Sequence, residues 1–337
     1  MYRPQDWFVF VLTNLFALLA IVGNGFVCYV IYKRKRSSTT FLLIGSQAFS
    51  DCLYGILRAL SFLVCSTWFA NLSRGALALC EWDITLFLSC FAVSSLSMTA
   101  IAIDRFMRLY MPHRQKPTRT QTFLVVLAIW IIAVTSCFLG MVGIKTRQYF
   151  GSDHFVTCFI GFQELANYAF FDKAHGYWTF TVLIFYFPMI ATGILYAFII
   201  YKVKKIRPFG VTNEDRLKRS QMQRERTIKM LITIVVVYYF LASPITYITQ
   251  AVVIRTGKHI TCGKGNVFSL PFVAINMILI STVINPVILC WFNETFSMEI
   301  KRLLGMSVND SDADGTLTTN SNTRSKSVMQ STSATRV

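Results

Sequence analysis

Long apolar segments separated by short polar ones dominate the chain. Six of these segments contain no Asp, Glu, Lys or Arg, namely residues 7–32, 84–103, 120–144, 174–201, 230–254 and 265–293. A seventh, Phe41–Cys65, contains only Asp51 and Arg58. Each can cross a hydrocarbon core of about 30 Å as a helix, which takes about 20 residues. Strands of a membrane barrel are about 10 residues long and alternate, so the pattern predicts seven transmembrane helices.

The remaining segments complete the predicted organisation. Residues 1–6 are a short extracellular N-terminus, and residues 7–290 form the seven-helix bundle. Residues 291–304 have an amphipathic pattern, which predicts a short helix on the membrane surface. Residues 305–337 are rich in Ser, Thr, Asn and Asp and contain no aromatic residue, which is typical of a disordered cytoplasmic tail. The predicted fold class is an all-α membrane protein.

Composition and charge support this interpretation. Hydrophobic residues make up 54% of the 337 residues and charged residues 15%, whereas a soluble domain has about 25% charged residues. The net charge is +17, and basic clusters follow the first span, the third span and the fifth span. By the positive-inside rule, the N-terminus is outside and the C-terminus is in the cytoplasm. The basic cluster follows the first apolar run, which is too long for a signal peptide, so no cleaved signal is expected.

Four polar residues lie near the middle of four different spans. Counted from the inner end of each span, Asn24, Asp51, Ser94 and Asn285 are about 13–16 Å deep, at about 1.5 Å per helical residue. Polar groups within a membrane are costly and usually functional. We therefore expect these side chains to meet at one level of the bundle.

Further motifs occur in a fixed order along the same spans. They are Gly23-Asn24, Ser50-Asp51, Asp104-Arg105-Phe106, Trp130, Pro188 with Tyr196, Pro244 and Asn285-Pro286. In this combination the chain resembles the rhodopsin-like (class A) G-protein-coupled receptors over about Trp7–Leu304. The resemblance implies a plasma-membrane receptor that transduces an extracellular ligand into activation of a heterotrimeric G protein. No nucleophile, base and oxyanion set that would indicate an enzyme is evident.

The resemblance implies an allosteric sodium site at mid-membrane, and no other cofactor or metal. The matching positions are Asp51, Ser94, Ser281 and Asn285. Oxygen ligands around a carboxylate suit a hard cation. The alternative is a purely structural hydrogen-bond network around a protonated Asp51.

The resemblance also implies a switch for G-protein coupling. Its residues are Asp104, Arg105, Tyr196, Pro244, Asn285 and Pro286. In the family, the arginine matching Arg105 contacts the G protein once helix six moves outward, and Asp104 holds it in the resting state through a charge pair. The prolines permit kinks.

Several switch positions depart from the family pattern. Phe106, Ala242 and Leu289 replace a tyrosine, a tryptophan and a second tyrosine, and the acidic partner at the start of helix six falls on Arg224. These changes predict a loosely held resting state with constitutive activity. The alternatives are a non-signalling or constitutively active seven-helix receptor or scaffold with degenerate switches, and a transporter, which the lack of internal repeats disfavours.

Outside the spans, the resemblance implies a disulfide between Cys80 and Cys158. Cys65 and Cys262 could form a second one. Asn71 begins an outward-facing glycosylation sequon. At the C-terminus, Thr335 and Val337 match a PDZ-domain ligand, and phosphorylation of the preceding Ser/Thr run would recruit arrestin. Membrane lipids are further expected partners, and nucleic acid is not.

Ligand recognition is expected to centre on Arg58. Arg58 lies seven residues after Asp51, hence on the same helix face, about 10 Å nearer the outside. An always-charged group at this depth needs an anionic partner, which is either Asp83 or a ligand anion. The other candidate pocket residues are the cations Lys173, His175 and Arg255 and the aromatic residues Phe87, Tyr239 and Tyr247. The family positions for a retinal-binding lysine and an amine-binding aspartate hold Leu279 and Phe87, which excludes opsin and aminergic ligands.

Overall fold

The computed structural model describes most of the predicted spans. The described residues are 4–33, 39–64, 75–115, 117–141, 146–151, 155–160, 184, 186–205, 226, 228–230, 232–233, 235–237, 239, 270–292, 294–303 and 305–306. The chain divides into two compact units, Met1–Asn293 and Glu294–Val337. Each unit is described by itself.

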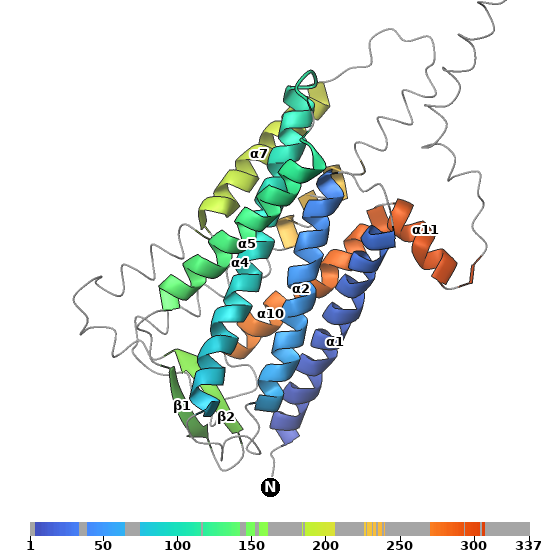
Figure 1. The fold of residues 1–337 in the computed structure, drawn as a ribbon. Coiled ribbons are helices and arrows are strands. Elements are labelled where there is room, and N and C mark those ends of the chain that lie inside the picture. Colours follow the sequence, from blue (N-terminus) through green and yellow to red (C-terminus); the bar gives the residue numbers. More distant parts are fainter. Residues whose placement is uncertain are drawn as a thin grey trace, which may run out of the picture. The chain divides into compact units, whose positions relative to one another are not determined.

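The first unit contains six long helices and one hairpin among its described residues (Figure 1). The helices are α1 (Pro4–Lys33), α2 (Thr39–Val64), α4 (Gly75–Tyr110), α5 (Arg119–Met141), α7 (Phe187–Lys205) and α10 (Leu270–Phe292). They correspond to the first five predicted spans and the seventh. The predicted sixth span is described only at scattered residues between 226 and 239.

Four of these helices are long and apolar enough to cross a membrane. They are Val11–Lys33 of α1, Thr39–Leu60 of α2, Thr85–Tyr110 of α4 and Arg119–Phe138 of α5. The apolar part of α7, Phe187–Val203, is shorter. Over residues 270–292, α10 carries no charged residue.

Helices α2 and α4 form the centre of the first unit. Their most apolar windows are 56% and 61% buried, against 28% for α1 and 22% for α5. Helix α2 packs between α1 and α4, and α4 also contacts α5 and α7, as Figure 1 shows. Exposed apolar residues recur along one face of α1, at Val11, Leu15, Leu18 and Val22. Such a face suits contact with lipid tails, while polar side chains gather in the centre.

Glycines allow α1 to approach two neighbours closely. A Cβ atom on Gly55 of α2 would lie 3.0 Å from Ile21 Cγ1 and 3.1 Å from the carbonyl oxygen of Ala17. A Cβ atom on Gly23 would lie 3.1 Å from Cγ of Pro286 in α10. Small residues at such contacts let backbones pack tightly where no hydrophobic effect drives helices together.

A β-hairpin follows α5 and was not predicted from the sequence. Strands β1 (Thr146–Gly151) and β2 (Phe155–Ile160) pair antiparallel, with Gln148 opposite Cys158. Both strands contact α4, and Figure 1 shows them beside its N-terminal end. The hairpin therefore brings the backbone of β2 to the end of α4 that contains Cys80. The side chains of Cys80 and Cys158 lie outside the described ones, so their bond stays a prediction.

Local signals fix two helix boundaries. Thr118 Oγ1 accepts a hydrogen bond from the Gln121 amide at 3.2 Å, while the Thr118 amide donates to Gln121 Oε1 at 2.9 Å. This reciprocal capping box starts α5. In the second unit, α11 (Glu294–Leu303) is shorter than the predicted helix 291–304. It ends where Gly305 adopts a φ of 69° and the Met306 amide donates to the Lys301 carbonyl at 2.9 Å.

Candidate transmembrane signalling site

The carboxylate of Asp51 is the centre of a buried hydrogen-bond network. Ser94 Oγ of α4 donates to Asp51 Oδ1 at 2.5 Å, and Asn285 Nδ2 of α10 donates to Oδ2 at 3.0 Å. All three side chains are at most 3% exposed. Three helices are thus joined through one acidic group, as the depth estimate predicted for these residues.

Two further side chains extend this network. Ser50 Oγ donates to the Gln47 carbonyl at 2.8 Å and lies 2.9 Å from Ser94 Oγ. Asn24 Nδ2 donates to the carbonyls of Ala20 and Thr282 at 2.9 and 3.0 Å, which ties α1 to α10. The four predicted polar residues therefore share one level, although Asn24 bonds to backbone rather than to Asp51.

Ser281 does not contact Asp51. Its hydroxyl donates to the Ile278 carbonyl in its own helix at 2.6 Å. Asn285 Oδ1 is buried and has no hydrogen-bond partner among the described residues. The carboxylate of Asp51 and this free amide oxygen are hard oxygen ligands, so the residues present fit a sodium ion. Asp51, Ser94 and Asn285 would hold it.

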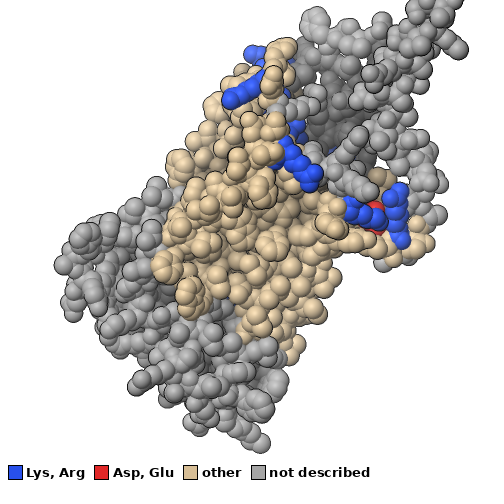
Figure 2. All heavy atoms as spheres, in the orientation of Figure 1, with Lys and Arg blue, Asp and Glu red and all other residues tan. Residues whose placement is uncertain are grey.

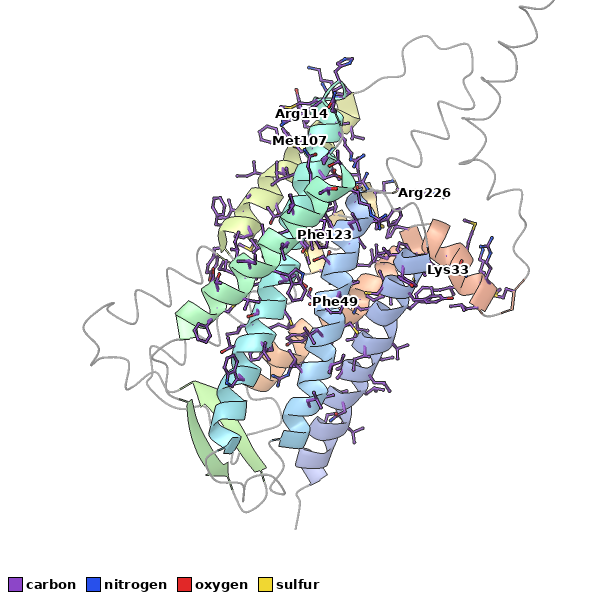
Figure 3. All side chains as sticks on the ribbon, in the orientation of Figure 1. Lys33, Phe49, Met107, Arg114, Phe123 and Arg226 are labelled. Atoms are coloured by element: carbon purple, nitrogen blue, oxygen red, sulfur yellow. The ribbon has the colours of Figure 1, made fainter. Side chains whose placement is uncertain are left out.

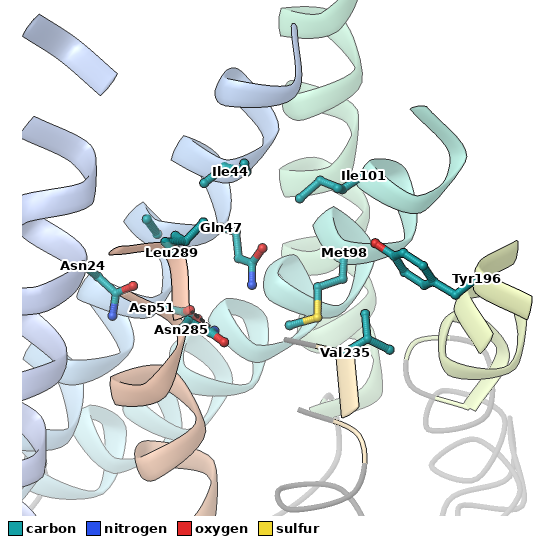
Figure 4. Close-up of a pocket in the computed structure, with 11 residues that line it drawn as sticks. Asn24, Ile44, Gln47, Asp51, Met98, Ile101, Tyr196, Val235, Asn285 and Leu289 are labelled. Atoms are coloured by element: carbon teal, nitrogen blue, oxygen red, sulfur yellow. Dashed lines mark hydrogen bonds between the residues drawn. The ribbon is translucent and has the colours of Figure 1, made fainter. Parts of the chain in front are cut away.

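A small cavity of about 20 Å³ lies beside this network within the bundle. Figure 4 shows Asp51, Asn285 and Asn24 on one side of it and Tyr196 on the other. Its remaining lining residues are Ile44, Gln47, Ala48, Met98, Ile101, Val235 and Leu289. Sequence reasoning missed Gln47 and Met98 as lining residues, because neither belongs to a motif.

Tyr196 and Leu289 line the same cavity from α7 and α10. Leu289 is 4% exposed and Tyr196 is 5% exposed. The isobutyl side chain of Leu289 has no hydroxyl group, so it cannot take part in a water-bridged contact with the Tyr196 phenol.

Helices α4 and α7 are joined by hydroxyl groups. Thr99 Oγ1 lies 2.9 Å from Thr192 Oγ1, and it donates to the Pro188 carbonyl at 3.4 Å. Ser95 Oγ lies 3.3 Å from the hydroxyl of Tyr239, one of the few described residues of the sixth span. Tyr239 therefore faces α4, and its predicted place in the ligand pocket stays a prediction.

At the end of α4, Asp104 is bonded to a residue that the sequence did not indicate. Arg108 Nε donates to both carboxylate oxygens, at 3.0 and 2.9 Å, and Thr40 Oγ1 donates to Oδ2 at 2.8 Å. The predicted pair of Asp104 with Arg105 is wrong for this structure. Arg105 Nε is buried and has no partner among the described residues. Residues one apart on a helix do not face each other, whereas residues four apart do.

Phe106 occupies the motif position where a tyrosine is usual. Its ring stacks on Tyr110 with centroids 4.4 Å apart and meets Phe198 of α7 edge-on at 6.3 Å. Tyr110 donates from its hydroxyl to the Phe198 carbonyl at 2.9 Å. The aromatic contact between α4 and α7 therefore needs no hydroxyl on residue 106.

Basic residues gather at the end of the first unit where α1, α4 and α7 finish. We call Lys33, Arg108, Arg114, Arg119 and Lys205 the basic end; all but the half-buried Arg108 are exposed. Figure 2 shows blue side chains there and an almost uncharged tan surface over the helices below. Figure 3 shows Arg114 beyond the end of α4, and the exposed apolar side chains of Phe49 and Phe123 on α2 and α5.

Arg58 lies on α2 in the half opposite the basic end. Its guanidinium carbon lies 5.2 Å from the ring centroid of Phe87. Phe87 also meets Tyr54 edge-on, with centroids 6.2 Å apart. Arg58 Nε is buried and has no hydrogen-bond partner among the described side chains, which do not include that of Asp83. Arg58 therefore lies against Phe87, another of the candidate pocket residues, and the ligand pocket itself stays a prediction.

Several predicted residues lie outside the described ones. They are Cys65, Asn71, Lys173, His175, Pro244, Tyr247, Arg255, Cys262, Thr335 and Val337, together with the departures Arg224 and Ala242. Their roles stay predictions.

Comparison with known proteins decides the family. The model of the "7 transmembrane receptor (rhodopsin family)" matches residues 23–289. The chain belongs to the rhodopsin family of seven-transmembrane receptors. This confirms the predicted family and the seven-helix fold. Rhodopsin-family proteins are multi-pass receptors of the plasma membrane that couple to heterotrimeric G proteins, and they are not enzymes.

Relatives in this family are distant. The chain is 23% identical to the substance-P receptor of Rattus norvegicus over 296 residues, covering 86% of this chain and 68% of that receptor. It is 26% identical to the neuromedin-K receptor of Homo sapiens over 295 residues, covering 84% of this chain and 58% of that receptor. At this distance the fold and family carry over, while ligand and coupling must be argued from this chain's own residues.

Proposed function

We propose that this rhodopsin-family protein converts binding of an extracellular ligand into activation of a heterotrimeric G protein at its basic end. The hydrogen bonds from Ser94 and Asn285 to Asp51 carry the proposal, because they couple three helices at mid-membrane. A ligand that favours a different arrangement of these helices shifts the population of receptor states. The basic end lies on the cytoplasmic side by the positive-inside rule, with the N-terminus outside.

The ligand in this proposal carries an anionic group that pairs with Arg58. Arg58 is half-buried, its Nε is without a described partner and its guanidinium lies against Phe87. The cation–π contact positions the guanidinium but does not use its N–H donors, and Nε has no hydrogen-bond partner among the described residues. A carboxylate or phosphate takes such donors in a charge-assisted, bidentate pair.

A peptide is the favoured form of this ligand. The similar proteins are receptors named for substance P and neuromedin K, and the relatives bind peptides. An acidic side chain or a C-terminal carboxylate would supply the anion for Arg58. An anionic small molecule is the second candidate, supported by the same Arg58 contacts.

A sodium ion at Asp51 is proposed to stabilise the resting state. The buried carboxylate, Ser94 Oγ and the unpartnered Asn285 Oδ1 supply its oxygen ligands. The ion would neutralise the carboxylate charge when bound. Because α2, α4 and α10 each provide one ligand, an arrangement that separates these helices would release it.

The C-terminal segment is proposed to bind further partners. Thr335 and Val337 match the terminal pattern that PDZ domains add as a strand, and phosphorylated Ser/Thr residues before them would recruit arrestin. Pull-down with a peptide of the last ten residues, with and without Val337, tests the PDZ proposal. Absence of any Val337-dependent partner would contradict it.

The proposed function is tested by measuring dissociation of each heterotrimeric G protein in cells that express the full chain. The matched variant is Arg105→Gln at equal surface level, because Arg105 is the proposed G-protein contact. We expect coupling to at least one Gα class, stimulated by a member of a panel of Asp-, Glu- or carboxylate-terminated peptides and reduced in Arg105→Gln. Normal surface display without coupling to any Gα class would overturn G-protein activation and favour the scaffold alternative.

A further inference from the structure

The carboxylate of Asp104 accepts its hydrogen bonds from groups other than its sequence neighbour. It accepts both bonds of Arg108 Nε and one bond from Thr40 Oγ1. The side chain is 8% exposed, so water does not compete strongly for it. Arg108 Nη2 also donates to Thr39 Oγ1 at 2.5 Å. Two threonines at the start of α2 and one arginine of α4 thus enclose a single carboxylate.

Helical spacing explains why Arg108 captures Asp104. An acidic residue four positions before a basic one on a helix is the favourable order for an ion pair. Arg105 is turned by about 100° from Asp104, so its guanidinium lies on another face of α4. Its Nε is buried and makes no hydrogen bond within the described part of the chain. Among the described residues, Arg105 therefore has no hydrogen bond to a carboxylate that must break before it meets another group.

The hydrogen bonds of Asp104 and Arg108 connect α4 to α2 rather than to α7. Arg108 and Asp104 tie the end of α4 to Thr39 and Thr40 at the start of α2. At the same level, Phe106 and Tyr110 of α4 contact Phe198 of α7, and Lys202 of α7 lies over the Tyr110 ring; none of these contacts uses Asp104. Movement on the α7 side of α4 consequently leaves the ion pair intact.

We propose that Arg108 is a positioning residue that sequesters Asp104 from Arg105 and so leaves Arg105 available for a G protein in the absence of ligand. This inference rests on the proposed coupling to a G protein. It assigns the basal activity predicted from the sequence to a residue outside the Asp-Arg-Phe motif. It also predicts that removing a cation, Arg108, strengthens the resting state, because the freed carboxylate can then turn to Arg105.

The experiment compares basal G-protein dissociation for four forms of the full chain at equal surface level. They are the wild type, Arg108→Gln, the double variant Arg108→Gln/Asp104→Asn and the control Val125→Ala, which shortens an exposed side chain of α5 outside the basic end. We expect Arg108→Gln to lower basal dissociation about fivefold, the smallest effect of a typical coupling energy. The double variant should recover most of the lost basal dissociation, since no carboxylate remains to hold Arg105, and Val125→Ala should match the wild type. An unchanged or raised basal signal in Arg108→Gln would overturn the proposal.

A second measurement separates this inference from the proposed function. Double-mutant cycles of thermal unfolding in detergent need no G protein. In the wild-type background, Asp104→Asn and Arg105→Gln should be additive. In the Arg108→Gln background the same two changes should show coupling, because the Asp104–Arg105 bond forms there. Additivity in both backgrounds would overturn the role of Arg108 even if the protein activates a G protein. Coupling in the second background without any G-protein response would instead overturn the proposed function alone.

Discussion

Asn285 donates a hydrogen bond to Asp51 across 3.0 Å, although 234 positions separate the two residues in the chain. The bond joins α10 to α2 at the middle of the bundle. Ser94 completes it from α4, so the carboxylate is shared by three helices. A polar contact of this kind between distant segments defines which helices are neighbours, and it is costly to leave unmade in a low-dielectric interior.

Removing the amide of Asn285 should destabilise the bundle. In Asn285→Ala the buried Asp51 carboxylate loses one of its two side-chain donors, which costs about 1–3 kcal/mol. Thermal unfolding of the purified protein in detergent measures the loss. The control is Val287→Ala on the same helix, where the side chain is 58% exposed and the expected change is within about 0.5 kcal/mol. Equal effects from the two variants would contradict the role of the Asp51 bond.

Gly55 should tolerate no side chain. The Cβ atom of Gly55→Ala would lie 3.0 Å from Ile21 Cγ1 and 3.1 Å from a backbone oxygen that cannot move aside, so surface expression should fall. The matched variant is Gly25→Ala in α1, where no atom lies within 4 Å of the new Cβ. There we expect unchanged or slightly raised stability, because alanine is the better helix former by about 1 kcal/mol. Full surface expression of Gly55→Ala would mean that α1 and α2 are farther apart than the structure shows at Gly55.

Sodium should stabilise the resting protein through Asp51. Replacing potassium chloride by sodium chloride at constant ionic strength should raise Tm, corresponding to about 1.4 kcal/mol when sodium is tenfold above its Kd. The increase should vanish in Asp51→Asn, which removes the anionic ligand, and persist in Ser281→Ala, because Ser281 bonds to Ile278 instead. A sodium effect that survives Asp51→Asn would place the ion elsewhere.

Cys80 should be required for display at the cell surface. A disulfide to Cys158 closes a loop of nearly eighty residues, worth on the order of 4 kcal/mol. Cys80→Ala should therefore reduce surface labelling strongly, and mass spectrometry of the non-reduced protein should identify the Cys80–Cys158 peptide. Cys290→Ala, which removes a half-buried free thiol, is the control. Normal display of Cys80→Ala would contradict the disulfide.

The sequence predicted the helices and the central polar residues because their signals are strong. A charge-free segment of about 20 residues crosses the lipid bilayer stably as a helix, which satisfies its own backbone hydrogen bonds. The depth of Asp51, Ser94 and Asn285 follows from the fixed rise of a helix, and one shared level was enough to bring them together.

Side-chain choices within a helix could not be predicted in the same way. Ser281 has a competing acceptor in its own helix, the Ile278 carbonyl, and a hydroxyl often takes it. The Asp104–Arg108 pair was not predicted because Arg108 lies outside the Asp-Arg-Phe motif. The spacing of four residues that favours such a pair is present in the sequence. The hairpin of β1 and β2 was missed because residues 146–160 lack regular polar and apolar alternation.

The most direct test of the account measures G-protein dissociation in cells for the wild type and Arg105→Gln at matched surface levels, with no added ligand. The buried Nε of Arg105, which has no hydrogen-bond partner among the described residues, predicts a basal signal in the wild type for at least one Gα class, and loss of that signal in the variant. A wild-type protein that reaches the surface and gives no signal with any Gα class, or a signal unaffected by Arg105→Gln, would contradict the account.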